Sequence, residues 1–458
     1  MRRRLFALCL ALGCGVAGPA RAVDLESEEG YALVRQMLSR SQTEREAAAQ
    51  ALIEAGDRTL VAALVDSIFY TPREQRDALY AVLASLTGES LTGYYDWVEY
   101  VGAHESPRPK PGYANFKVAA FAQIDARYRE IFYSGAPVRL RLEEIVSGGV
   151  PVAGIPALDN PPTIKARKAR YLAEDELVFG VELGGEARAY PVRFLSWHEM
   201  ANDELGGEPI TLSFCTLCGS GIVYSGITVT GENLTFDTSG LLYRSNKLML
   251  DRETRSLWSN LTGSPVVGRM VASGASLEVL PSTLTTWGDW RERHPRTTTL
   301  DLEGVRSSVD PRFSFDYSPG AADRARRGVA FPVWLKNERL DRNAEIYALR
   351  IGRSAKAYPL DRLFAERLVN DSFAGRSLVL IADEASQSVR AYDSGGRIFE
   401  SASRDEAIDA EGIRWKIGES SLVPVSVDSE FGPLERLAGH VAFWFGWYAF
   451  YPQSEVYE

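Results

Sequence analysis

The residues best suited to chemistry stand in one block of the sequence. Cys215 and Cys218 form a C-x-x-C pair, and His198 and Glu199 precede it. Two thiolates and an imidazole are a ligand set that suits Zn²⁺ or Cu(I). We therefore predict a transition-metal site with Cys215, Cys218 and His198 as ligands and Glu199 as a proton acceptor or orienting group. If the protein is an enzyme, this cluster favours redox or metal-assisted chemistry over hydrolysis.

Two other interpretations of the same residues stay open. Cys215 and Cys218 can act as a thiol–disulfide oxidoreductase, with His198 or Glu199 moving the proton. In both enzymatic interpretations the catalytic candidates are Glu199, Cys215 and Cys218. Alternatively, the pair is a plain disulfide in a non-enzymatic binding or scaffold module. Such a disulfide closes almost no loop and so adds little to stability.

The flanking sequence predicts the elements that position these side chains. Residues 177–183 and 187–190 read as two strands joined by a glycine turn, and residues 191–203 have helical spacing. Residues 210–214 read as a strand that ends at Cys215. We expect the helix end and the following turn to bring the four side chains to one point. Gly219 and Gly221 would supply the positive φ of that turn.

A second segment of the chain repeats this pattern. Residues 184–224 align without a gap on residues 352–392, at an offset of 168 positions. Ala187-Arg-Ala-Tyr-Pro191 matches Ala355-Lys-Ala-Tyr-Pro359, for example. We predict a tandem duplication of one strand-rich α+β domain. Its copies are called region 1 (residues 140–305) and region 2 (residues 306–458).

The reactive residues occur in region 1 alone. At the aligned positions of region 2, His198 becomes Glu366, Glu199 becomes Arg367, Cys215 becomes Asp383 and Cys218 becomes Ser386. Framework residues between these positions persist. This contrast predicts one site in region 1 and a degenerate one in region 2. The Ser/Thr/Gly-rich run at residues 235–246 is either the lining of a substrate pocket or a solvated loop.

The N-terminal part has a different character. Residues 24–103 place apolar side chains at helical spacing, with Gly56 as a stop and Asp57 as a cap. Paired helices of this length predict a HEAT-like segment that holds a partner protein or region 2. Residues 104–139 are predicted to be a linker and a connecting helix. Together these features predict the α+β class.

Composition and the first residues bear on location and partners. A net charge of −10 and a pI near 5.3 argue against a nucleic-acid partner. Residues 1–22 combine three arginines, a short apolar run and Ala20-Arg-Ala22, which predicts a signal peptide and a periplasmic or secreted protein. A lipoprotein ending at Cys14 is less favoured, because Ala11 stands where leucine is preferred. No later run is long enough for a membrane helix. The partner is predicted to be a small-molecule substrate or another protein.

These motifs together resemble the exported bacterial and archaeal family DUF3179. The resemblance rests on Ile155-Pro-Ala-Leu-Asp-Asn-Pro161, Ala187-Arg-Ala-Tyr-Pro191, His198-Glu199, Cys215-Thr-Leu-Cys-Gly219, Ser239-Gly-Leu-Leu-Tyr243, Asp251-Arg-Glu-Thr254 and Ala442-Phe-Trp-Phe445. It covers about residues 140–458. Thr216 stands where the family is expected to have proline, a change that removes no thiol. The resemblance implies the domain and supplies no reaction.

Overall fold

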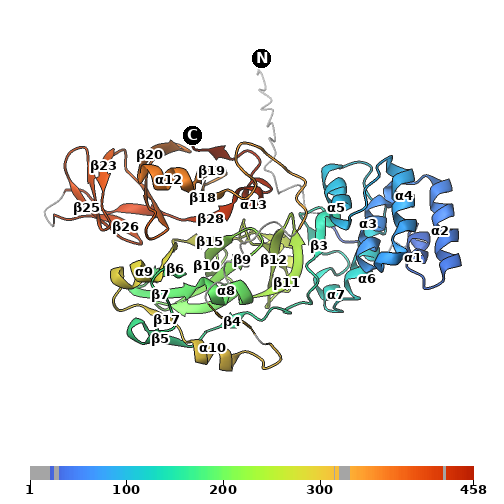
Figure 1. Cartoon of the computed structure of the whole chain (residues 1–458), viewed down its shortest axis with the longest axis horizontal. Coiled ribbons are helices and arrows are strands. Elements are labelled where there is room, and N and C mark those ends of the chain that lie inside the picture. The colour runs from blue at the N-terminus through green and yellow to red at the C-terminus, as the bar shows by residue number, and fades with distance from the viewer. Residues whose placement is uncertain (1–20, 25–29, 314, 319–330, 427–429) are drawn as a thin grey trace, which may run out of the picture.

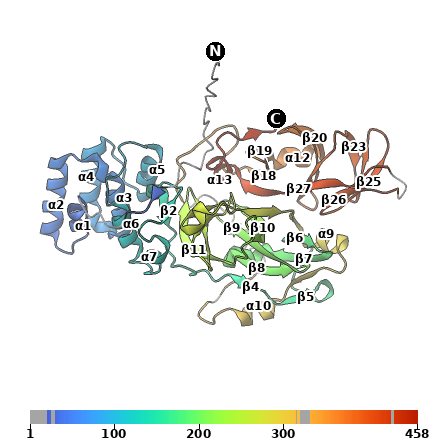
Figure 2. The same cartoon turned by 180° about the vertical axis from the view of Figure 1, so that it is seen from behind.

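The computed structural model describes residues 21–24, 30–313, 315–318, 331–426 and 430–458. These residues have a mixed α+β architecture, so the predicted class is confirmed. Helices gather at one end of the molecule, region 1 lies beside them, and region 2 lies along region 1 (Figure 1). The view from behind shows the same arrangement (Figure 2). Most of the predicted signal peptide lies outside the described residues.

The N-terminal segment is helical, as its periodicity predicts. Its helices are α1 (Ala32–Gln36), α2 (Gln42–Ala55), α3 (Val61–Tyr70), α4 (Asp77–Thr87) and α5 (Tyr94–Ala103). Residues 104–139 contain α6 (Tyr113–Phe121) and α7 (Tyr128–Ile131). Gly56 ends α2 in the left-handed region, where glycine has no Cβ penalty. The Asp57 carboxylate accepts a hydrogen bond from the backbone N–H of Thr59 at 3.0 Å. Among the described residues, no helix combines the length and apolar character needed to cross a membrane.

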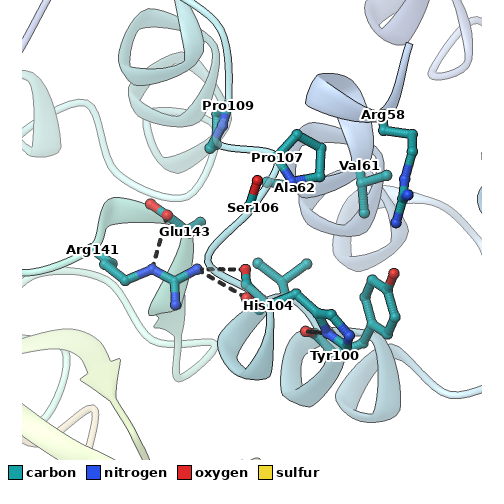
Figure 3. A pocket seen from close by; sticks show the side chains of 11 residues that line it. Arg58, Val61, Ala62, Tyr100, His104, Ser106, Pro107, Pro109, Arg141 and Glu143 are labelled. Carbon is teal, nitrogen blue, oxygen red and sulfur yellow. Dashed lines mark hydrogen bonds and ion pairs between the residues drawn. The ribbon is translucent and has the colours of Figure 1, made fainter. Parts of the chain in front are cut away.

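Arg141 ties the end of α5 to region 1. Its guanidinium donates to the carbonyl oxygens of Gly102 at 2.9 Å, Val101 at 3.0 Å and His104 at 3.1 Å. Figure 3 shows Arg141 beside His104. These are carbonyls that a helix leaves without partners at its C-terminus. The cavity beside Arg141 is small, with a volume of about 30 Å³.

Region 1 consists mainly of three sheets. Its strands are β2 (Pro137–Val138), β3 (Ile145–Ser147), β4 (Leu158–Asp159), β5 (Thr163–Lys165), β6 (Leu177–Leu183), β7 (Glu186–Pro191), β8 (Met200–Leu205), β9 (Glu208–Cys215), β10 (Ser220–Thr228), β11 (Phe236–Tyr243), β12 (Asn246–Asp251), β13 (Leu257–Ser259), β14 (Pro265–Val267), β15 (Leu277–Leu280), β16 (Thr283–Thr286) and β17 (Thr298–Leu300). The sheet orders are β15-β10-β9-β8-β4, β16-β6-β7-β17-β5 and β1-β2-β14-β13-β12-β11-β3, where β1 is Arg21–Ala22. Its helices are α8 (Val192–His198) and α9 (Trp287–Arg293), and α10 (Leu302–Ser308) follows.

One predicted element of region 1 is wrong. The helix expected over residues 191–203 ends at His198, and Met200–Leu205 forms strand β8, paired with β9 and β4. Glu199 stands between the two elements with φ +56°, and its N–H donates to the carbonyl of Leu195 at 2.8 Å. Met200 and Ala201 suit a helix as well as a buried strand, so periodicity over a short run cannot locate this break.

Region 2 is also strand-rich. Its strands are β18 (Glu345–Ile351), β19 (Ser354–Pro359), β20 (Leu368–Phe373), β21 (Arg376–Asp383), β22 (Ser388–Asp393), β23 (Phe399–Ala402), β24 (Glu406–Asp409), β25 (Arg414–Ile417), β26 (Ser421–Pro424), β27 (Leu434–Leu437), β28 (Gly439–Phe443) and β29 (Glu455–Val456). Its helices are α12 (Leu360–Glu366) and α13 (Trp444–Tyr448). The sheet orders are β28-β18-β19-β29 and β20-β21-β22-β27-β26-β25-β24-β23.

Candidate functional site

The C-x-x-C pair forms the tight turn between β9 and β10. The Cys218 backbone N–H donates to the Cys215 carbonyl at 3.2 Å, and Gly219 follows with φ +61°. The turn at the end of the strand is therefore as predicted. Gly221 has no positive φ; it is needed because a Cβ there would lie 2.1 Å from the ring of Phe179. For Gly221 the predicted reason is wrong, since close packing rather than backbone conformation requires glycine.

Both cysteines are free and buried. Their side chains lie beneath the β11–β12 hairpin, where the carbonyl oxygen of Ser245 is 3.0 Å from the Cys218 sulfur and 4.0 Å from the Cys215 sulfur. Region 2 covers them from another side: the Phe443 N–H donates to the Cys218 carbonyl at 2.8 Å. A Cβ on Gly446 would lie 2.9 Å from the Cβ of Cys218. Neither sulfur is accessible to an incoming thiol.

The two thiols differ electrostatically. Burial raises the pKa of Cys218 well above its usual value, and the neighbouring Cys215 raises it further. Burial also opposes ionisation of Cys215. The Cys218 thiol, together with the backbone N–H and the side-chain charge of Lys247, nevertheless holds the pKa of Cys215 below its usual value. Any thiolate in the pair is therefore on Cys215.

His198 does not join the cysteines. Its Nδ1 lies 2.8 Å from the carbonyl oxygen of Pro156, and its Nε2 lies 2.5 Å from the hydroxyl of Tyr317. The Phe315 ring also packs edge-on against it. With Nδ1 donating to the carbonyl and Nε2 accepting from the hydroxyl, the ring is neutral and both nitrogens are occupied. Burial lowers the pKa of His198 to about 4.

The low pKa of His198 predicts acid sensitivity. The folded pKa is about 4 against an ordinary value of 6.5, so the stability conferred by the neutral ring is complete above pH 6.5 and is lost as pH falls through about 4. Between about pH 7 and pH 4, the wild type should lose about 3 kcal/mol more free energy of unfolding than His198→Gln. Urea titrations at several pH values measure this difference. The control His104→Gln changes an exposed ring, and equal pH slopes for wild type and His198→Gln would refute the prediction.

Glu199 lies on the opposite side of the chain from His198. Its side chain accepts a hydrogen bond from the Thr216 hydroxyl at 3.3 Å, and one carboxylate oxygen lies 3.9 Å from Nζ of Lys247. Lys247 Nζ also donates to the backbone carbonyl of Glu199. Burial raises the pKa of Glu199 and lowers the pKa of Lys247. The two consecutive side chains of His198 and Glu199 therefore lie in different surroundings.

These positions overturn the predicted functions. Among the described residues no group of three or more His, Cys, Asp or Glu side chains is arranged to hold a metal ion. The prediction of a metal-binding function through Cys215, Cys218 and His198 is therefore wrong, because the imidazole is committed elsewhere. The thiol–disulfide alternative is also wrong, since thiol exchange requires access to a sulfur. The disulfide of the third interpretation is absent, as both thiols are free.

A cavity of about 130 Å³ lies next to the cysteine turn. Its polar end consists of Glu199, Thr216 and Lys247. Its remaining walls are mainly apolar and include Ile155, Leu241, Leu248 and Phe331. Residues 238–242 of β11 line it, so the run at 235–246, which contains β11 and the turn into β12, contributes to the cavity wall and is not a solvated loop. The cysteines lie behind this wall and do not line the cavity.

Sequence reasoning missed Lys247. It stands second in β12, next to residues that face the core, and its side chain is only 5% exposed. A lysine inside an apolar strand is an unusual pattern, because buried charges cost free energy unless they are paired. This pattern in the sequence could have identified Lys247 as a candidate site residue. What the sequence could not provide was the packing of the β11–β12 hairpin over the turn that follows β9.

A larger cavity, lined by Arg293 of region 1 and by residues of region 2, is a weaker candidate. It holds about 180 Å³ and has Arg293, Arg390 and Arg404 in its wall. These guanidinium groups are already paired: Arg293 and Arg404 lie 3.0 and 2.8 Å from Asp289, and Arg390 lies 2.7 Å from Glu419. Their charge is therefore neutralised within the protein, which leaves little attraction for an anionic ligand.

Comparison with known proteins identifies the chain by family alone. No curated protein and no solved structure matches it. The family described as "Protein of unknown function (DUF3179)" matches residues 152–454, which contain the cysteine turn, the cavity's polar end and nearly all of region 2. The match leaves out the N-terminal helices. The chain belongs to the DUF3179 family.

Proposed function

We propose that regions 1 and 2 are two copies of one fold and that only region 1 carries a reactive site. Buried contacts recur at the offset of 168 residues found in the sequence. The Tyr190 hydroxyl donates to Asp203 at 2.7 Å, and the Tyr358 hydroxyl donates to Asp371 at 2.8 Å. Recurrence of both the residues and their contact supports duplication more strongly than sequence likeness alone.

A second pair of contacts supports the same proposal. The indole N–H of Trp258 donates to Asp251 at 2.8 Å, and that of Trp415 donates to Asp409 at 3.0 Å. Each aspartate ends one strand, and each tryptophan lies on the next strand of the same sheet. Region 2 thus keeps this framework although it lacks the cysteines.

The finer features of the N-terminal part are proposals as well. We propose that α2 to α5 are HEAT-like pairs, because α2 packs on α4 and α3 on α5, as the layers of a helical solenoid do. The domain limits 24–103, 104–139, 140–305 and 306–458 and export through residues 1–22 remain part of the proposal. Secretion of a fusion that carries residues 1–22 would test the last point.

We infer that the cavity of region 1 binds a compact molecule with an apolar body and one carbonyl group, and that Glu199 transfers a proton on this molecule. One observation carries the inference. Lys247, which is buried, and Glu199, whose side chain is 17% exposed, lie 3.9 Å apart in the wall of a mainly apolar cavity. Apolar pockets with a few convergent polar groups are the usual form of small-molecule sites. The volume of about 130 Å³ restricts the ligand to a small one.

The geometry supports proton abstraction next to a carbonyl. Lys247 donates an N–H to the carbonyl oxygen, and the Glu199 carboxylate removes a proton from the adjacent carbon. The C–H bond breaks, an O–H bond forms on Glu199, and the electron pair moves to the carbonyl oxygen beside Lys247. Burial brings the pKa values of both groups closer to neutral pH, where a general base is most effective. Thr216 orients the carboxylate.

Exchange of the α-hydrogens of 2-butanone in D₂O tests this function. Proton NMR at neutral pD would follow the loss of the α-proton signals. We expect Glu199→Gln to slow the protein-dependent exchange about 100-fold, the usual contribution of a general base. The matched control Glu204→Gln removes an exposed carboxylate on β8 and should exchange at the wild-type rate. Equal rates in Glu199→Gln and the wild type, with both proteins folded by circular dichroism, would overturn the proposal.

A further inference from the structure

We propose that Lys247 forms a covalent imine with small aldehydes and ketones in the region 1 cavity. This inference deepens the proposed function and rests on it, because it names the substrate class and a nucleophile for the same site. The evidence is the difference between Lys247 and two other buried lysines of the chain, together with the position of Lys247 in the cavity wall.

The other two lysines are held in contact ion pairs. Nζ of Lys117 lies 2.8 Å from Asp66, and Nζ of Lys356 lies 2.6 Å from Asp371. Both side chains are at least nine-tenths buried. A buried ammonium normally needs such a partner, because its desolvation is otherwise uncompensated. These two residues therefore show how the fold keeps a lysine charged.

Lys247 is held differently. Its nearest described carboxylate, that of Glu199, is 3.9 Å away, which is too long for a hydrogen bond. Nζ donates instead to a neutral group, the backbone carbonyl of Glu199. An amine held in this way keeps its orientation in the neutral form. Burial lowers the pKa of Lys247, so more of it is the nucleophilic free amine.

The neighbouring carboxyl group completes the chemistry. The amine lone pair of Lys247 attacks the carbonyl carbon, and a proton moves from nitrogen to oxygen to give a carbinolamine. The Glu199 carboxylic acid then protonates the hydroxyl group, the C–O bond breaks, and water leaves. A protonated imine on Lys247 and a carboxylate on Glu199 result. Burial raises the pKa of Glu199, which favours the acid form that this step requires.

The same arrangement explains how the two proposals connect. Once formed, the iminium withdraws electrons from the adjacent carbon more strongly than a carbonyl group does. The Glu199 carboxylate produced by dehydration is then in place as the base that removes the α-proton. Apolar walls at Ile155, Leu241 and Leu248 favour a short alkyl chain over a sugar or an amino acid. The substrate class is therefore a small aliphatic aldehyde or ketone.

Reductive trapping tests the imine. The whole chain is incubated with 2-butanone at neutral pH, reduced with sodium cyanoborohydride, and mapped by peptide mass spectrometry. We expect the sec-butyl group on Lys247 to exceed that on every other lysine, because the cavity holds the ketone beside Nζ and burial favours the free amine there. Lys356, buried but paired with Asp371, is an internal control and should stay unmodified.

Variants and a binding measurement separate the outcomes. Lys247→Arg should reduce the total label to the level carried by the other lysines, and Glu199→Gln should slow labelling of Lys247 at least about tenfold as a lost general acid. Saturation-transfer NMR reports butanone binding without reduction. Binding without enrichment of label on Lys247 would overturn the imine and leave the proposed function standing. Neither binding nor label would overturn both, and because the wild type alone decides this, a misfolded variant does not obscure the result.

Discussion

Asp251→Ala should lower the free energy of unfolding by about 4 kcal/mol, because each buried donor left without a partner costs roughly 1–3 kcal/mol. The Asp251 carboxylate is fully buried and accepts four hydrogen bonds. The donors are both the N–H and the hydroxyl of Thr254, the N–H of Ser256 and the indole N–H of Trp258. Alanine removes every acceptor at once. Urea unfolding monitored by tryptophan fluorescence measures the loss.

A nearby aspartate provides the comparison. Asp237 on β11 pairs with Arg252 at 2.7 Å, at the edge of solvent. Asp237→Ala should cost no more than about 1 kcal/mol, the usual range for partly exposed ion pairs. If Asp251→Ala proves as mild as Asp237→Ala, the carboxylate does not organise the β12–β13 connection. Asp409→Ala in region 2 should change the free energy of unfolding in the same way as Asp251→Ala. Both losses should be large, or both should be small.

Glu419→Gln should be destabilising by about 3–5 kcal/mol, the cost of removing one member of a buried ion cluster. Glu419 lies 2.7 Å from Arg390 and 3.5 Å from Arg436, and all three side chains are buried. It also accepts from the hydroxyl of Thr283 in region 1 at 2.6 Å. Glutamine leaves two buried guanidinium groups without a counter-charge and weakens the contact between regions. Thermal and urea unfolding at neutral pH measure the effect.

The same cluster predicts a second contribution to the free energy of unfolding that is lost in acid. Burial favours neutral Glu419, but Arg390, His294 and Arg436 outweigh it and hold the pKa of Glu419 well below its usual value of 4.5. The stability from its charge is therefore present above pH 4.5 and is lost as pH falls toward the folded pKa. Below about pH 4 the gap between wild type and Glu419→Gln should narrow. The exposed control Glu435→Gln should match the wild type throughout, and a gap that stays constant with pH would contradict the assignment.

Much of the local structure could be predicted because its causes are local. Strand-like runs on either side of a glycine turn located β6 and β7, and glycine and aspartate located the end of α2. The strand before the C-x-x-C pair and the turn made by that pair were also as predicted. The candidate site was only partly predictable. Glu199 was identified, whereas His198 was assigned to the same point although it packs against Tyr317.

Two causes explain the incorrect and the missing residues. The helix ends at His198, and Glu199 follows it with a positive φ. Glutamate rarely adopts this backbone conformation, so its residue type gave no reason to expect it there. Lys247 reaches Glu199 from a hairpin that is distant in sequence. The residues near the turn after β9 do not determine which hairpin packs over it.

The sequence by itself determined the α+β class, the N-terminal helices, the position of the cysteine turn and the family to which the chain belongs. The tertiary structure alone decided that both thiols are enclosed, that His198 packs elsewhere, and that Glu199 and Lys247 share an apolar cavity. The physical reason is the distance along the chain over which each interaction acts. Turns and strands follow from backbone preferences and side-chain periodicity over a few residues, whereas burial and charge pairing depend on which sheets pack together.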